Sequence, residues 1–261
     1  MTLIETHLFS LLLMLAVAAA SGVVGVFALM RRMTLASDSM SHVALPGLGL
    51  AIMLRFNPLL GAFAALIFGA IIVWALERKT KVPREAIIGV LFSAALAIGS
   101  LLASPEELID AFFGEIKSIG LLELGVGLIV AIGIILFILI FKDKLVLGTM
   151  SPDLATTVGV HVSRLNLYFM LVFVLNIMLG LQFLGVLLMG SLIIIPAATS
   201  RNITKSLGPA LVCSAIIACI TVTVGLFASV TLGSSLGPTI ITFGAALFFL
   251  SLFTQKLNSN I

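Results

Sequence analysis

The stretch Arg31-Arg32-Met-Thr-Leu-Ala-Ser-Asp-Ser-Met-Ser-His-Val-Ala-Leu-Pro-Gly-Leu-Gly-Leu-Ala-Ile-Met-Leu54 decides the fold of this chain. It is long and apolar enough to cross a membrane as a helix, which takes about 20 residues, yet it contains Asp38 and His42. An ionisable side chain near the bilayer centre costs roughly 2.5–3.5 kcal/mol on insertion scales, so it usually has a partner or a function. The stretch therefore predicts a membrane helix that carries a polar site.

Asp38 and His42 are candidate metal ligands. Residues four apart share one face of a helix, with Cβ atoms about 5–6 Å apart, and borderline divalent metals accept carboxylate and imidazole ligands. Two ligands are too few for a closed structural site, which suits an ion that must leave again. The residues leave two alternatives open, a structural hydrogen-bond network between helices and a proton relay.

The residues around this pair indicate an interrupted helix. Pro46 and Gly47 follow His42 by about one turn, and a proline removes a backbone donor and can free a carbonyl toward a cavity. Three hydroxyl groups surround the pair, on Ser37, Ser39 and Ser41. We predict that Pro46 and Gly47 form a kink or gate in this span.

The composition is that of a membrane protein. Of the 261 residues, 61% are hydrophobic and 10% are charged, whereas a soluble domain carries roughly 25% charge. No run between apolar segments is long enough for a separate soluble domain, so residues 1–261 are predicted to form a single all-α, polytopic transmembrane domain. The sequence has no G-x-x-x-x-G-K-[ST] motif and no catalytic constellation. These absences argue against a P-loop ATP site and against an enzyme.

Apolar segments predict nine membrane helices. The segment from Tyr168 to Thr199 is almost continuously apolar, so it forms either two spans or one span and a broken helix. Gln182, in Gly180-Leu-Gln-Phe-Leu-Gly185, is the predicted turn. The nine predicted spans are 8–30, 34–54, 59–76, 86–103, 118–141, 166–183, 184–200, 208–230 and 238–255.

The distribution of Lys and Arg supports this topology. If the segment after the first helix lies in the cytoplasm, all 14 basic residues except Arg55 and Lys117 lie inside. That asymmetry follows the positive-inside rule and predicts an outside N-terminus and a cytoplasmic C-terminus. Because the basic residues are distributed as topology signals, they do not indicate nucleic-acid binding. Ser104 with Glu107 predicts a capped short helix in an acidic outer loop.

The segment Gly148-Thr-Met-Ser-Pro-Asp-Leu-Ala-Thr-Thr-Val-Gly-Val-His161 predicts a short cytoplasmic helix. Ser151 can cap it, Pro152 suits its first position, and Asp153 complements the N-terminal dipole. Gly159 can end it. Such a helix is either a loop element without a partner or a docking site for a cytoplasmic protein.

Two further residues stand out in apolar surroundings. Pro196 lies inside the segment Phe183–Arg201, where a proline kinks a helix, so it is predicted as a second kink or gate. Glu123 lies near the outer end of a span and is predicted either to reach the interface or to belong to an outer gate.

Together these segments resemble the permeases of the zinc/manganese/iron-type ABC importers. The matching elements occur in family order and cover essentially the whole chain: the segment Arg31–Gly47, the start of the fourth helix at Ile88-Gly89, the outer-loop element Ala111-Phe-Phe-Gly-Glu115, the coupling segment Met150-Ser-Pro-Asp-Leu-Ala155 with Gly159, and Leu187-Leu-Met-Gly-Ser-Leu-Ile-Ile-Ile-Pro-Ala-Ala-Thr199. The last outer loop, Ser229–Pro238, lacks the acidic or aromatic residues expected in many members, which argues against docking there.

The resemblance implies a permease of a prokaryotic cell membrane that works as a homodimer. It implies two cytoplasmic ATPase subunits, coupled through Ser151, Pro152, Asp153, Leu154, Ala155 and Gly159, and an extracytoplasmic metal-binding protein. Asp38 and His42 fall on the family's intramembrane motif, which implies a place in the metal pathway. If this helix lines the pore in both protomers, the dimer offers two carboxylates and two imidazoles. The transported ion is expected to be zinc first, then manganese or iron, with no permanently bound cofactor. The alternative is an ATP-independent or proton-coupled metal carrier.

Overall fold

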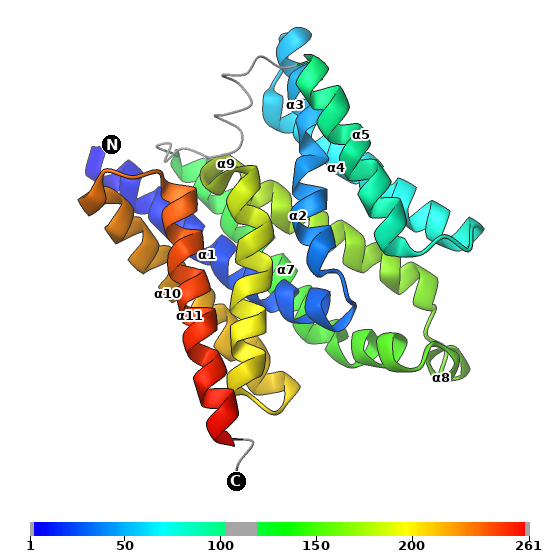
Figure 1. Cartoon of the computed structure of the whole chain (residues 1–261). Helices are drawn as coiled ribbons and strands as arrows, with labels where there is room; N and C mark the ends of the chain where they lie inside the picture. The colour runs from blue at the N-terminus through cyan, green and yellow to red at the C-terminus, as the bar shows by residue number, and fades with distance from the viewer. Residues whose placement is uncertain (1–2, 103–118, 259–261) are drawn as a thin grey trace.

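The computed structural model describes residues 3–102 and 119–258, and within these ranges it contains helices and no strand (Figure 1). The helices are α1 (Leu3–Met30), α2 (Thr34–His42), α3 (Ala44–Met53), α4 (Pro58–Lys79), α5 (Arg84–Leu102), α7 (Leu121–Met150), α8 (Pro152–Thr157), α9 (Val162–Ile203), α10 (Leu207–Leu232) and α11 (Leu236–Asn258). The all-α prediction is confirmed.

Eight helical segments in the described part of the chain are long and apolar enough to cross a membrane. Helix α9 supplies two of them, Val162–Leu181 and Leu184–Ile203. Helices α2 and α3 together cover Thr34–Met53 and match the span predicted for residues 34–54. Counting that broken pair as one crossing gives the predicted number of about nine.

The turn inside α9 lies at Gly185, not at the predicted Gln182. Gly185 has φ 70° and ψ 172°, a conformation that glycine adopts without the steric cost that a Cβ atom would impose. The two halves of α9 fold back on each other (Figure 1), and Gly180 in the first half packs directly against the Met189 side chain in the second. A side chain at residue 185 would strain this backbone conformation, which explains why the turn lies at a glycine.

Two predicted loops differ from the structure or fall outside it. Helix α7 continues to Met150, nine residues beyond the predicted end at 141, because the charged residues from Lys142 to Lys144 follow the apolar run without a helix breaker. The acidic loop with Ser104 and Glu107, and the element Ala111–Glu115, lie outside the described residues.

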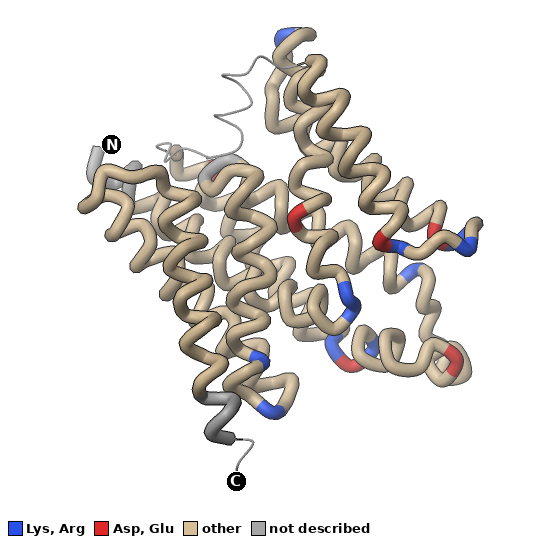
Figure 2. The backbone as a smooth tube through the Cα atoms, viewed as in Figure 1, with Lys and Arg blue, Asp and Glu red and all other residues tan. Residues whose placement is uncertain are grey.

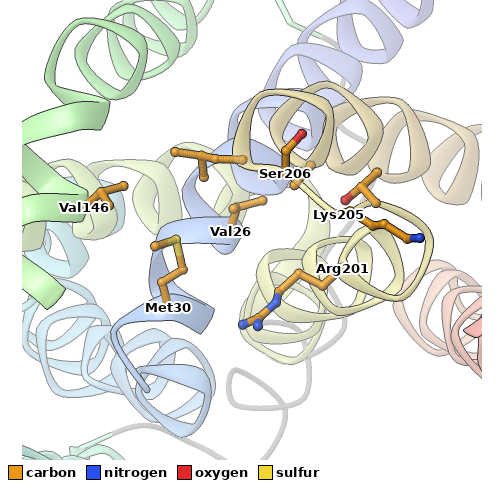
Figure 3. A pocket seen from close by; sticks show the side chains of 9 residues that line it. Val26, Met30, Val146, Arg201, Lys205 and Ser206 are labelled. Carbon is orange, nitrogen blue, oxygen red and sulfur yellow. The ribbon is translucent and has the colours of Figure 1, made fainter. Parts of the chain in front are cut away.

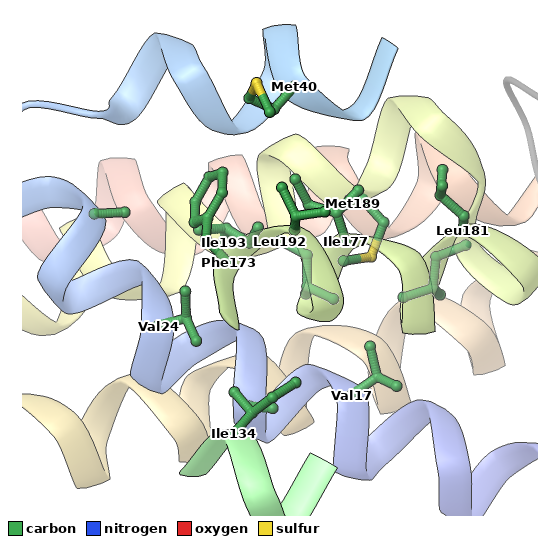
Figure 4. Packing of buried hydrophobic residues seen from close by; sticks show 14 of the residues in the cluster. Val17, Val24, Met40, Ile134, Phe173, Ile177, Leu181, Met189, Leu192 and Ile193 are labelled. Atoms are coloured by element: carbon green, nitrogen blue, oxygen red, sulfur yellow. The ribbon is translucent and has the colours of Figure 1, made fainter. Parts of the chain in front are cut away.

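Helix α1 lies at the centre of the bundle, packed against α7, α9 and α10. Gly22 meets the α10 backbone at Ser214, whose Oγ donates to the Gly22 carbonyl at 2.7 Å, and Gly25 meets the carbonyl of Ile193 in α9. In Figure 4, α9 lies between Met40 of α2 and the α1 residue Val17. Small residues in a buried central helix allow the close approach that membrane helices need.

Charged residues lie mostly at one end of the bundle (Figure 2). This basic end comprises the end of α1, the turn from α4 to α5, the segment from the end of α7 to the start of α9, and the turn from α9 to α10. Its basic residues include Arg31, Arg32, Arg78, Lys79, Lys81, Arg84, Lys142, Lys144, Arg164, Arg201 and Lys205. Arg55, between α3 and α4, lies at the opposite end.

Candidate functional site

Asp38 and His42 lie on one face of α2, as their spacing predicts. The Asp38 Oδ1 and the His42 Nε2 are 4.0 Å apart, close enough for a single ion to lie between them after a small adjustment. The Asp38 side chain is 52% exposed, whereas the His42 side chain is 9% exposed. The imidazole is therefore held by its surroundings, and the carboxylate faces outward from this one chain.

The helix breaks immediately after this pair. Helix α2 ends at His42, four residues before Pro46, and α3 begins at Ala44, two residues before Pro46. Proline has no N–H group and its ring collides with the carbonyl of the residue four positions earlier, which is His42. The break therefore follows from Pro46, and it puts His42 at the C-terminus of a helix.

Neighbouring helices fix the two side chains. The ring of Phe92 in α5 meets the His42 ring edge-on at a centroid distance of 5.1 Å. Gly190 in the second half of α9 packs against Asp38, so close that a Cβ atom there would lie 2.9 Å from Asp38 Oδ1. The sequence alone does not indicate that Phe92 or Gly190 belongs to this site. For Gly190, its place in the Leu187–Thr199 motif is the one sequence feature that points to a function.

The serine hydroxyls beside the pair bond to their own helix. Ser37 Oγ donates to the Thr34 carbonyl at 2.7 Å, and Ser41 Oγ donates to the Asp38 carbonyl at 2.6 Å. Such back-bonding to the preceding turn is typical of serine inside a helix. In this conformation the two hydroxyls reinforce α2, and the carboxylate and imidazole remain the candidate ligands.

Gly47 and Pro196, both predicted as kink or gate residues, lie within helices. Gly47 lies within α3 and touches the backbone of Gly61 in α4, with room for a side chain on neither residue. Its role is therefore close packing of α3 on α4. Around Pro196 the backbone of α9 stays helical, and the non-helical residue in this element is Gly185. The predicted gate at Pro196 is thus not accompanied by a helix break.

Helix α8 is the predicted short helix of the coupling segment. Pro152 is its first residue and Asp153 lies in its first turn. Gly159, at φ 80°, ends it: the N–H of Val160 donates to the Ala155 carbonyl and that of Gly159 to the Thr156 carbonyl, the Schellman arrangement. Ser151 holds the N-cap position, but its hydroxyl makes no capping hydrogen bond. Its carbonyl instead accepts from the Ala155 N–H at 3.0 Å.

A polar cluster at the basic end connects the start of α9 to α1 and α4. Arg31 Nη1 donates to Asn166 Oδ1 at 2.8 Å, and the guanidinium lies 4.6 Å from the centre of the Phe169 ring. Trp74 Nε1 donates to the Ser163 carbonyl at 2.9 Å. Burial, with a smaller contribution from nearby Arg84, lowers the pKa of Arg31 to about 10, so Arg31 stays charged at neutral pH.

The remaining sequence candidates lie apart from the pair. Glu123 accepts from the Gly120 N–H at 3.3 Å at the start of α7, which supports its interpretation as a residue at the helix end. His161 is exposed next to α8. Within the described ranges, no three His, Cys, Asp or Glu side chains gather in a metal-binding group. One copy of this part of the chain therefore offers the pair alone.

Comparisons with known proteins agree with this geometry. Residues 4–255 match the model of the ABC 3 transport family. The chain is 30% identical over 241 residues to the high-affinity zinc uptake system membrane protein ZnuB of Haemophilus influenzae, covering 89% of this chain and 91% of that one. It is 28% identical over 245 residues to the manganese transport system membrane protein MntC of Listeria monocytogenes, covering 92% and 88%.

A solved structure shares the fold. PsaBC from Streptococcus pneumoniae in complex with Fab superimposes with a TM-score of 0.80 at 26% identity, over 93% of this chain and 89% of that one. An inward-facing putative metal-chelate type ABC transporter superimposes with a TM-score of 0.76 at 20% identity, over 95% of this chain and 85% of that one. With a family match over nearly its whole length, this chain belongs to the ABC 3 transport family.

Proposed function

We propose that this chain is the membrane-spanning subunit of an ATP-driven importer for divalent transition-metal ions, zinc first and manganese or iron next. The observation that carries the proposal is the Asp38–His42 pair, whose Oδ1 and Nε2 atoms are 4.0 Å apart on the short helix α2. The names of the ZnuB and MntC relatives support zinc and manganese, and imidazole and carboxylate ligands accept both metals.

In this mechanism the ion passes the pair without being trapped. His42 lies at the break between α2 and α3, and Asp38 lies one turn before it and is half exposed. The proposed functional unit is a homodimer in which α2 of each copy borders the path, so that two carboxylates and two imidazoles can share one ion. Weak ligation by each copy then lets the ion move on toward the cytoplasm.

The basic end is proposed to face the cytoplasm. This orientation follows the positive-inside rule, and it puts the N-terminus outside and the C-terminus inside. An extracytoplasmic metal-binding protein would then deliver the ion at the end of the bundle where Arg55 lies.

Helix α8 is the proposed docking site for the cytoplasmic ATPase. Leu154 and Val158 are exposed, and their spacing of four residues puts both apolar side chains on one face of α8 and its C-terminal end. Met150, the last residue of α7, is exposed as well. The next helix, α9, connects this site to the rest of the bundle. Its Ser163 accepts a hydrogen bond from Trp74 of α4, and its Asn166 accepts one from Arg31, which begins the segment that holds Asp38. Movement of α8 can reach the ion site through these contacts.

Transport into membrane vesicles tests the energy source. We expect vesicles that contain the permease, its ATPase and its binding protein to take up radioactive zinc or manganese when ATP is supplied. Uptake should stop when the P-loop lysine of the ATPase is replaced by alanine, and should persist when an ionophore collapses the proton gradient. Uptake that needs the gradient and survives without the ATPase would instead identify a proton-coupled carrier.

A further inference from the structure

A pocket of about 310 Å³ opens at the basic end, away from the Asp38–His42 pair. It lies between the ends of α1, α7, α9 and α10 (Figure 3). One side is formed by the turn that joins α9 to α10, and the opposite side by apolar residues of α1 and α7. Neither the proposed ion path nor the proposed ATPase site uses it.

The turn makes one side of the pocket positive. Arg201 and Lys205 line it, no carboxylate does, and neither cation forms an ion pair with another described residue. In Figure 3 the Arg201 guanidinium extends to the side of the turn where Met30 lies, and the Lys205 side chain extends from the same turn in the other direction. Ser206 precedes α10 and its hydroxyl makes no capping bond, so the N–H groups of Leu207 and Gly208 add donors beside the two cations.

The opposite side of the pocket is apolar and continues along α7 toward the membrane. Val26 and Met30 of α1 and Val146 of α7 line it. Leu139 and Ile132 precede Val146 by seven and fourteen residues, which puts all three on nearly the same face of α7, and both are exposed. An elongated apolar group that leaves the pocket can therefore lie along this face of α7.

We propose that the pocket binds the headgroup of an anionic phospholipid. Its phosphodiester would meet Arg201 and the first turn of α10, the flexible Lys205 side chain would turn in to join them, and an acyl chain would run along Leu139 and Ile132. Basic pockets between membrane helices at the cytoplasmic surface favour such headgroups. A free phosphate would use the cations but not the apolar wall. Only the assignment to the inner leaflet rests on the proposed orientation; the binding chemistry does not rest on metal transport.

The site would fix the end of α9 that carries the ion-path contact. Arg201 lies in the last turn of α9, three turns after Gly190, which packs against Asp38. A lipid headgroup bound by Arg201 and Lys205 joins this end of α9 to α10, and so stabilises the folded bundle by mass action.

Lipid titration of the full-length purified protein in detergent tests the proposal. Native mass spectrometry would give dissociation constants for dioleoyl phosphatidylglycerol and for dioleoyl phosphatidylcholine. We expect the anionic lipid to bind at least about tenfold more tightly. Because each basic residue near a membrane surface contributes about fivefold in affinity, Arg201→Gln with Lys205→Gln should weaken phosphatidylglycerol binding by about thirtyfold.

The matched control is Lys142→Gln with Lys144→Gln. It removes the same charge from the basic end at residues that do not line the pocket, and it should leave the affinity unchanged. If the double variant at 201 and 205 fails to fold, as judged by its thermal unfolding, Arg201→Gln alone should still weaken binding about fivefold.

Three results would overturn the proposal. They are equal affinities for the two lipids, an unchanged phosphatidylglycerol affinity in the Arg201 and Lys205 variants, and a loss of that affinity in the Lys142 and Lys144 control as large as in the Arg201 and Lys205 variant. A fourth arm identifies the source of the phosphate: millimolar inorganic phosphate should not displace the lipid, and displacement would assign the pocket to a free anion.

Discussion

Gly190 of α9 lies directly against Asp38 of α2. A methyl group built at Gly190 would lie 2.6 Å from the Asp38 Cα and 2.9 Å from its Oδ1, whereas carbon atoms in van der Waals contact are about 3.5–4.0 Å apart. No side chain fits between the two helices at this level. The position of the candidate ion ligand is therefore set by the absence of a side chain in a distant helix.

This contact predicts that Gly190→Ala impairs transport although it changes no charge. The added methyl group must push α2 away or turn the Asp38 side chain, and overpacking of this kind costs about 1–3 kcal/mol. If that cost falls on the transport-competent arrangement, uptake should drop by about tenfold or more. The measurement is tracer uptake at matched membrane levels of protein.

Gly133→Ala is the control for this prediction. Gly133 lies in the membrane helix α7, and a methyl group there would meet no atom within 4 Å, so uptake should stay at the wild-type level. Equal uptake by the Gly190 and Gly133 variants would show that the contact with Asp38 does not matter for transport.

The Arg31–Asn166 hydrogen bond predicts a coupling defect. Arg31→Gln removes a charged hydrogen bond, worth about 1.5–3 kcal/mol, and the contact of its guanidinium with Phe169. We expect metal uptake to fall while ATP hydrolysis by the assembled complex continues, because α9 no longer holds the end of α1 that leads to α2. Uptake and ATPase rates measured on the same proteoliposomes check this outcome.

Arg32→Gln provides the comparison at the neighbouring position. Arg32 is exposed and has φ 56°, and glutamine in its place keeps a side chain on this backbone. The variant therefore removes a positive charge next to Arg31 but leaves the contacts of Arg31 with α9 in place. It should transport normally. A parallel loss of uptake and ATP hydrolysis in the Arg31 variant would point to a folding defect and contradict a role in coupling.

The exposed apolar face of α8 predicts where the ATPase binds. Leu154→Asp puts a charge on this face without disturbing the buried Ala155, and we expect the ATPase to co-purify in clearly reduced amounts. Val82→Asp introduces the same charge at another exposed apolar residue of the basic end, in the turn from α4 to α5. Unchanged ATPase recovery with Leu154→Asp, or equal loss with Val82→Asp, would contradict docking on α8.

Local signals in the sequence predicted the elements that depend on local chemistry. Pro152 and Gly159 delimit α8 because one suits a first helical position and the other a left-handed residue. The spacing of Asp38 and His42 sufficed to place both on one helix face. Pro46 marked the helix break, although its steric effect falls one turn earlier, at His42.

Contacts between distant helices could not be predicted in the same way. Membrane helices are apolar on most sides, so hydrophobic periodicity does not reveal which face meets which neighbour. Gly190 against Asp38, Phe92 against His42, and Arg31 with Asn166 all depend on that rotation. The polarity of Gln182 predicts the turn in α9 there, whereas the reversal requires the left-handed backbone that Gly185 adopts.

The most direct test of the ion path is metal uptake by Asp38→Asn and His42→Ala in cells that lack their own high-affinity importer, with ATPase and binding protein co-expressed. Asp143→Asn and His161→Ala, exposed residues of the basic end, serve as matched controls. Zinc and manganese tracers should show uptake lost in the first two variants, with the complex assembled, and retained in the controls; the tracer that wild type transports identifies the metal. Unchanged uptake in the Asp38 and His42 variants would contradict the metal path and leave the pair a structural contact.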